Sequence, residues 1–171
     1  MNPTADIADG AQVRSARILI VDDERDNRVL LELVLVREGF LVVSTASGEE
    51  ALAAVAHQPP DLILVDMLMP GMDGHEVAAK IKSDPATENI RVIIFSALDD
   101  RSARMVALTS GADDFFTKPM DRDELCARLR AHLASSRMRL NLGGVEPAAT
   151  GQPRPGSSPP PENSDDGTSR T

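Results

Sequence analysis

The sequence predicts an α/β fold, an open, doubly wound parallel sheet of five strands alternating with five helices. Five short apolar runs, rich in Val and Ile, recur along the chain, and each is followed by a segment with helical periodicity. This alternation is typical of parallel sheets with right-handed crossovers and helices on both faces. It fills roughly 120 of the 171 residues, which is too few for an eight-stranded barrel.

Each apolar run is expected to form one strand. The runs are short and nearly free of polar alternation, which suits strands that are buried on both faces. The expected strands are residues 17–21, 41–44, 62–65, 92–95 and 115–117.

The helices between the strands are identified by periodicity and by end signals. In residues 26–38, an apolar stripe is followed by Gly39 as a stop, and the stripe consists of Val29, Leu30, Leu33 and Val36. The other four helices begin at a Ser or Asp that can cap the first turn, and they are expected at residues 47–57, 73–83, 99–110 and 121–137.

The chain is expected to hold a single folded domain, residues 17–137, between two disordered tails, residues 1–16 and 138–171. The segment after Arg139 holds six of the twelve Pro and contains neither Phe nor Ile. Such a composition cannot bury enough apolar surface to offset the entropy lost on ordering.

The composition argues against several classes of function. The formal net charge of −9 and the lack of Trp and Tyr disfavour nucleic-acid binding, which uses basic patches and aromatic platforms. The single cysteine, Cys126, excludes an internal disulfide and a cysteine-based zinc site. Neither a signal peptide nor an apolar run of roughly 20 residues is visible, so a cytoplasmic location is expected.

Charged and hydroxyl side chains gather where the expected strands end. Asp22 and Asp23 follow the first strand, Asp66 the third, Ser96 the fourth and Lys118 the fifth. In a flavodoxin-like sheet with the strand order 2-1-3-4-5, the first and third strands are neighbours where the winding reverses. We therefore expect the three carboxylates in one cleft, with the hydroxyl and ammonium groups across it.

Three carboxylates in one cleft repel one another and need a cation. Mg²⁺ prefers oxygen ligands, typically one or two carboxylates together with water and phosphate oxygens. A carboxylate flanked by Mg²⁺, a lysine and a hydroxyl group can attack phosphorus and form an acyl phosphate. The cleft is therefore predicted to carry out phosphoryl transfer.

Four motifs, in this order, resemble the receiver domain of two-component response regulators. They are RILIVDDE, DLILVDMLMPGMDG, VIIFSA and FTKP, and the resemblance covers about residues 17–136. It implies that Asp66 is the phosphoacceptor. It also implies that Asp22, Asp23 and Asp66 hold Mg²⁺. The backbone carbonyl of Leu68 would be a further ligand.

The resemblance also implies roles for residues at the other strand ends. Ser96 matches the hydroxyl residue that binds the phosphoryl oxygens, and Lys118 matches the lysine that pairs with the phosphoryl group. The Lys118–Pro119 bond matches the family's cis peptide. Phe115 lies at the position of the switch aromatic residue, and its lack of a tyrosine hydroxyl favours a buried ring.

The resemblance implies a signalling function and not turnover of an external substrate. A histidine kinase or a phosphotransfer protein would donate the phosphoryl group to Asp66. The face made by the fourth helix, fifth strand and fifth helix would then contact a downstream protein or a second copy of the chain, with no direct contact to nucleic acid or membrane. Leu68 and Leu98 occupy two positions that tune dephosphorylation in the family, and they predict slow loss of the phosphoryl group.

Two alternatives stay open. The first is that the chain is the receiver part of a longer regulator with an enzymatic or DNA-binding output domain. The Pro-rich tail resembles a linker as much as a terminus. The second is an aspartate-nucleophile phosphatase, although such enzymes carry a second Asp where this chain has Leu68.

Three methionines near Asp66 and the single cysteine are interpreted as structural residues. Met67, Met69 and Met72 are expected to pack in the loop, and Cys126 is expected to be a small buried apolar residue.

Overall fold

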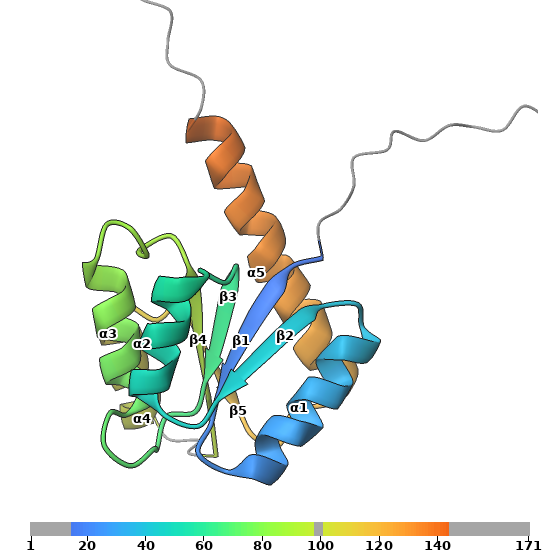
Figure 1. Cartoon of the computed structure of the whole chain (residues 1–171), viewed down its shortest axis with the longest axis vertical. Coiled ribbons are helices and arrows are strands. Elements are labelled where there is room, and N and C mark those ends of the chain that lie inside the picture. Colours follow the sequence, from blue (N-terminus) through green and yellow to red (C-terminus); the bar gives the residue numbers. More distant parts are fainter. Residues whose placement is uncertain (1–14, 98–100, 144–171) are drawn as a thin grey trace, which may run out of the picture.

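The predicted parallel sheet is observed, with the strand order β2-β1-β3-β4-β5 (Figure 1). The computed structural model describes residues 15–97 and 101–143, with side chains described as far as Ser135. Within these ranges the strands are β1 (Arg17–Val21), β2 (Leu41–Thr45), β3 (Leu62–Val65), β4 (Arg91–Ser96) and β5 (Asp114–Thr117). This is the flavodoxin-like order 2-1-3-4-5 that the sequence predicts.

Helices cover both faces of the sheet and bury two separate apolar clusters. The helices are α1 (Arg25–Arg37), α2 (Gly48–His57), α3 (Gly74–Ser83), α4 (Arg101–Thr109) and α5 (Arg122–Gly143). Side chains from α2, α3 and α4 pack on one face, whereas α1 and α5 pack on the other (Figure 1). Because successive residues of a strand point to opposite faces, a sheet covered on both sides needs continuous apolar strands.

The register of the strands brings the candidate residues to one edge. Val21 of β1 lies beside Val65 of β3, so the residues that follow, Asp22 and Asp66, leave the sheet side by side. The last residues of β4 and β5 are also paired, which brings Lys118 to the same carboxyl edge.

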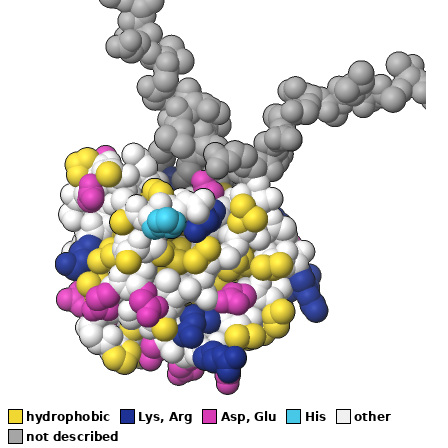
Figure 2. Space-filling model, in the orientation of Figure 1, with side chains coloured by type: hydrophobic (Ala, Val, Ile, Leu, Met, Phe, Trp, Pro, Cys, Tyr) yellow, Lys and Arg dark blue, Asp and Glu magenta, His cyan; other side chains and the backbone are white. Residues whose placement is uncertain are grey.

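The side of α1 that the sequence predicts to face the core is wrong. Leu31 and Leu35 are the buried residues of this helix. The four stripe residues are exposed, at 42% for Val29, 63% for Leu30, 56% for Leu33 and 58% for Val36. Apolar residues occur on two sides of α1, so periodicity alone does not identify its inner face. Figure 2 shows hydrophobic side chains at the surface over α1, at the lower right of the domain.

The last helix is longer than predicted. The sequence predicts an end near residue 137, whereas α5 continues to Gly143. Neither Gly nor Pro occurs from Arg122 to Leu142, and most of these residues are good helix formers. The other residues of the two expected tails, 1–14 and 144–171, lie outside the described part. Among the described helices, α5 included, none has the length and apolarity to cross a membrane.

Capping hydrogen bonds start α2 and α3, two of the helices on which the sequence shows capping signals. At α3 the Glu76 N–H donates to Asp73 Oδ1 at 3.0 Å, and the Asp73 N–H donates to Glu76 Oε2 at 3.2 Å. At α2 the Ser47 hydroxyl oxygen accepts from the Glu50 N–H at 3.2 Å, whereas the Glu50 carboxylate accepts from the Ala46 N–H. Each of these helices thus has one free N–H group of its first turn bound by a local side chain.

An ion-pair cluster ties together the edge of the sheet that lies opposite the candidate site. Asp113, directly before β5, accepts hydrogen bonds from Lys82 Nζ at 2.7 Å, from Arg91 and from the Val92 N–H at 2.9 Å. Burial alone would raise the pKa of the Asp113 carboxyl. The three hydrogen bonds outweigh burial and hold the pKa below its usual value.

Replacing Asp113 with Asn is expected to lower the unfolding free energy by about 2 kcal/mol at neutral pH, because Arg91 and Lys82 lose their counter-charge. The lowered pKa stabilises the folded state above the unfolded-chain value of about 3.9, and this contribution is lost as the pH falls through the folded-state value. In urea unfolding, the difference between wild type and variant should therefore shrink below a pH of about 4.

A matched control for this experiment is Asp123→Asn, because the Asp123 side chain is 85% exposed. The control should unfold like the wild type at every pH. A stability difference for Asp113→Asn that stays constant down to acid pH would contradict the assigned ion-pair cluster.

Candidate functional site

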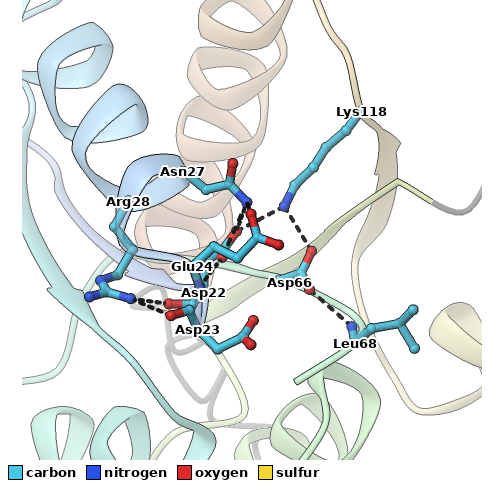
Figure 3. Close-up of polar contacts among 8 residues, drawn as sticks. All are labelled: Asp22, Asp23, Glu24, Asn27, Arg28, Asp66, Leu68 and Lys118. Atoms are coloured by element: carbon cyan, nitrogen blue, oxygen red, sulfur yellow. Dashed lines mark hydrogen bonds and ion pairs between the residues drawn. The ribbon is translucent and has the colours of Figure 1, made fainter. Parts of the chain in front are cut away.

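Three charged side chains meet at the carboxyl edge of the sheet (Figure 3). The Lys118 Nζ atom lies 2.8 Å from Asp22 Oδ2 and 2.8 Å from Asp66 Oδ1. These side chains are 19%, 3% and 14% exposed, respectively. The ends of β1, β3 and β5 therefore bring together two carboxylates and one ammonium group in a largely buried cluster.

Backbone contacts fix the position of Asp66. Its N–H donates to the Val21 carbonyl at 2.7 Å, which extends the pairing of β1 and β3 by one residue. One carboxylate oxygen of Asp66 faces Lys118, and the other accepts from the Leu68 N–H at 3.1 Å. Gly74 packs so closely against the Asp66 carbonyl that a Cβ at this position would overlap its oxygen.

Two side chains of α1 hold the acidic pair, and neither is predicted from the sequence (Figure 3). The Asn27 amide donates to Asp22 Oδ2 at 3.3 Å and to Glu24 Oε2 at 3.1 Å. The Arg28 guanidinium donates to the backbone carbonyls of Asp22 at 2.6 Å and of Asp23 at 3.0 Å. Their spacing, one helical turn after the acidic pair, is the signal that points to these residues.

Three further predicted residues lie at or beside the same edge. Ser96 is buried, and its carbonyl accepts the Lys118 N–H at 2.7 Å. The Lys118–Pro119 peptide bond is cis, as predicted. Asp23 is exposed to solvent beside Asp22.

The ring of Phe115 is buried on the opposite face of β5 from α5. It is 1% exposed and packs in the cluster beneath α2, α3 and α4. The Arg104 guanidinium of α4 lies 5.7 Å from the centroid of this ring. The ring therefore has the buried position that the sequence favours.

Burial and charge perturb the two titratable groups at the centre of the site. Burial raises the pKa of the Asp66 carboxyl, and the charge of Asp22 adds to this effect, although Lys118 opposes both. Burial lowers the pKa of Lys118, but its hydrogen bonds to the two carboxylates outweigh burial and raise the pKa above the usual value. One ammonium group between two carboxylates leaves a net negative charge, which favours binding of a further cation.

The oxygen donors at this edge fit a hard divalent cation. Asp22 and Asp66 already share a cation, the Lys118 ammonium group, and carboxylate oxygens are the ligands that Mg²⁺ prefers. In the described part of the chain, no three His, Cys, Asp or Glu side chains form a group that could hold a metal ion by themselves. Mg²⁺ commonly keeps several waters and needs only one or two carboxylates, so this pair is sufficient.

Comparison with known proteins identifies the family. A family model described as the response regulator receiver domain matches residues 18–130. The chain belongs to the response regulator receiver family. Receiver domains of this family act in two-component signalling and generally bind Mg²⁺.

Several relatives of this receiver are longer proteins. Response regulator PleD from Caulobacter vibrioides is 50% identical over 117 residues, which are 68% of this chain and 26% of PleD. The phosphate regulon transcriptional regulatory protein PhoB from Rhizobium meliloti is 36% identical over 135 residues, or 76% of this chain and 60% of PhoB. The chain thus spans only part of the length of these relatives.

A solved structure has the same fold as this receiver. A putative response regulator from Chloroflexus aurantiacus is 36% identical, with a TM-score of 0.69. The match covers 71% of this chain and 99% of that one.

The methionines near Asp66 and the cysteine of this receiver have the structural roles that the sequence predicts. Met67 and Met69 are buried, and Met72 packs against the same apolar cluster. Cys126 is 2% exposed, and burial raises the pKa of its thiol. These residues therefore belong to the core.

Proposed function

We propose that this receiver accepts a phosphoryl group on Asp66 from the phosphohistidine of a sensor histidine kinase or a phosphotransfer protein, in a Mg²⁺-dependent reaction. The observation that carries this proposal is the position of Lys118. Its ammonium group lies 2.8 Å from one oxygen of Asp66 and shares that contact with Asp22. Lys118 thus directly contacts both the proposed nucleophile and a second carboxylate that would hold the metal ion.

The transfer begins when a carboxylate oxygen of Asp66 attacks the phosphorus atom. The P–O bond forms as the P–N bond to the donor imidazole breaks, and the electron pair of that bond goes to the imidazole nitrogen. Lys118 stabilises the charge of the transferring group, and the Ser96 hydroxyl donates a hydrogen bond to a phosphoryl oxygen.

Asp22, Asp23 and Asp66 would hold the Mg²⁺ ion, which would neutralise charge on the transferring phosphoryl group. The backbone carbonyl of Leu68 is proposed as a further ligand. Asn27 holds the Asp22 side chain in position, and Arg28 holds the backbone of Asp22 and Asp23.

The output is proposed to pass through α4, β5 and α5. The phosphoryl group adds negative charge, toward which Ser96 and Lys118 shift, and Phe115 fills the space that Ser96 leaves. The contact between Phe115 and Arg104 connects this movement to α4. The outer side of α4 exposes three large apolar residues for a partner or a second copy, Met105, Val106 and Leu108.

The signal is proposed to pass either to a separate cytoplasmic protein or to an output domain of a longer regulator. The second alternative is supported by the relatives, since the chain spans 26% of PleD and 60% of PhoB. A phosphatase acting on external substrates is disfavoured, since Leu68 carries no acid or base two residues after Asp66.

Incubation with acetyl phosphate, followed by intact-protein mass spectrometry, tests this proposal. We expect the mass of one phosphoryl group to appear with Mg²⁺ and to be absent when EDTA removes the metal. Hydroxylamine should release the group, because acyl phosphates are cleaved by this nucleophile. Equal labelling in EDTA, or a label stable to hydroxylamine, would contradict the proposal.

Leu68→Asn is expected to accelerate loss of the phosphoryl group by about tenfold, because the amide can orient a hydrolytic water that leucine cannot. The Leu68 side chain is 61% exposed and lies beside the phosphorylation site, so the substitution should not disturb the core. Decay of the phosphorylated protein, followed by mass spectrometry, measures the rate. Leu98, the second predicted position, lies outside the described residues. An unchanged lifetime in Leu68→Asn would show that Leu68 does not shield the acyl phosphate.

A further inference from the structure

An aromatic ring lies against the ammonium group of Lys118. The Lys118 Nζ atom is 5.2 Å from the centroid of the Phe95 ring on β4. Phe95 is 7% exposed and belongs to the buried cluster beneath α1 and α5, so the surrounding core fixes its ring. A cation within about 6 Å of a ring centroid is attracted by the electron-rich face of the ring. The ammonium group therefore faces two carboxylates and one aromatic ring.

One side of the Lys118 side chain borders open space. Lys118 and Phe95 line a hollow of about 360 Å³, whose further lining includes Leu30 and Leu31 of α1 and Leu125 of α5. Lysine has a flexible four-carbon stem, and open space on this side allows other rotamers. Close packing along the stem therefore cannot by itself hold the ammonium group at Asp66.

The ring contact differs in kind from the two carboxylate contacts. Under the proposed function, Asp22 would bind the metal ion and Asp66 would carry the phosphoryl group. Both carboxylate partners of Lys118 thus change during the reaction. An aromatic ring neither titrates nor provides an oxygen ligand for Mg²⁺, so its attraction for the ammonium group persists through these changes.

We propose that Phe95 is a positioning residue that keeps the Lys118 ammonium group at the phosphorylation site while the two carboxylates change partners. This inference rests on the proposed function. Phe95 does not touch the reacting atoms, and it acts by restricting the conformations of Lys118. Loss of the ring is expected to slow phosphorylation of Asp66 about three- to tenfold.

The chain offers a matched pair of phenylalanines for the test. Phe95→Leu removes the ring beside Lys118. Phe116→Leu removes a ring from the neighbouring strand and the same buried cluster, where Arg128 lies 5.2 Å from the ring centroid. Rates of labelling by acetyl phosphate are measured at saturating Mg²⁺. Phe95→Leu should be about three- to tenfold slower than Phe116→Leu, and Phe95→Tyr, which keeps the aromatic face, should retain most of the wild-type rate.

A spectroscopic measurement provides a second readout that does not depend on labelling rates. The ring current of Phe95 should shift the Lys118 ε-methylene proton resonances upfield, and the shift should vanish in Phe95→Leu but persist in Phe116→Leu. Wild type that shows no such shift would overturn the proposal. So would equal labelling rates of Phe95→Leu and Phe116→Leu.

The two proposals fail in different ways. If the wild type cannot be labelled at all, the proposed function is wrong and the positioning role is lost with it. If the wild type is labelled normally but removal of the Phe95 ring has no specific effect, only the positioning role is wrong.

Discussion

Replacing Asp66 with Asn is expected to abolish phosphoryl labelling of the receiver. An amide of the same size cannot serve as the carboxylate nucleophile, so no acyl phosphate forms. The fold should persist, because burial raises the pKa of Asp66 and a neutral amide avoids the cost of a buried charge. We expect the unfolding free energy in urea to change by less than about 1 kcal/mol.

Asp26→Asn is the matched control for this result. Asp26 lies in the first turn of α1 and is exposed. Its replacement also removes one carboxylate, but full labelling is expected. Undiminished labelling of Asp66→Asn by the same donor would contradict the assignment of Asp66 as the phosphoacceptor.

Gly74→Ala is expected to lower the unfolding free energy by about 3 kcal/mol. A Cβ at Gly74 would overlap the Asp66 carbonyl oxygen and lie 3.0 Å from the Met67 Cα atom. These neighbours are backbone atoms, and the Gly74 N–H also donates to the Met67 carbonyl at 3.0 Å, so no side-chain rotation relieves the clash. Urea unfolding measures the stability, and labelling should slow because the backbone of Asp66 is displaced.

Gly39→Ala provides the comparison for Gly74→Ala. Gly39 has a φ of +86°, and a Cβ built there has no atom within 4 Å. Its replacement should therefore cost only the strain of the left-handed conformation, about 1 kcal/mol, and should leave labelling unchanged. Equal losses of stability in the two variants would show that close packing against Asp66 is not what requires Gly74.

The framework of the site could be predicted because strand ends are visible in the sequence. A run of buried residues defines each parallel strand, and the next polar residue must then lie at the carboxyl edge. Asp22 and Asp66 are 96 and 52 residues from Lys118 in the chain, yet this rule places all three together. The strand order, inferred from the fold class, supplied the remaining information.

The details that the sequence missed depend on the directions of side chains. In α1 both Leu33 and Leu35 belong to apolar stripes, and the packing of the helix on the sheet decides that Leu35 is buried. In β4 a continuous apolar run does not show which residue faces Lys118, so the role of Phe95 became visible only in the structure. The reach of Arg28 to the carbonyls of the preceding turn likewise requires the path of the backbone.

Direct mapping of the phosphoryl group on the labelled protein tests whether Asp66 is the phosphoacceptor. Borohydride reduction converts a phosphorylated aspartate to homoserine, and mass spectrometry of the resulting peptides identifies the position. We expect homoserine at residue 66 and none at Asp22 or Asp23. Modification at another residue, or a label that borohydride does not convert, would contradict it.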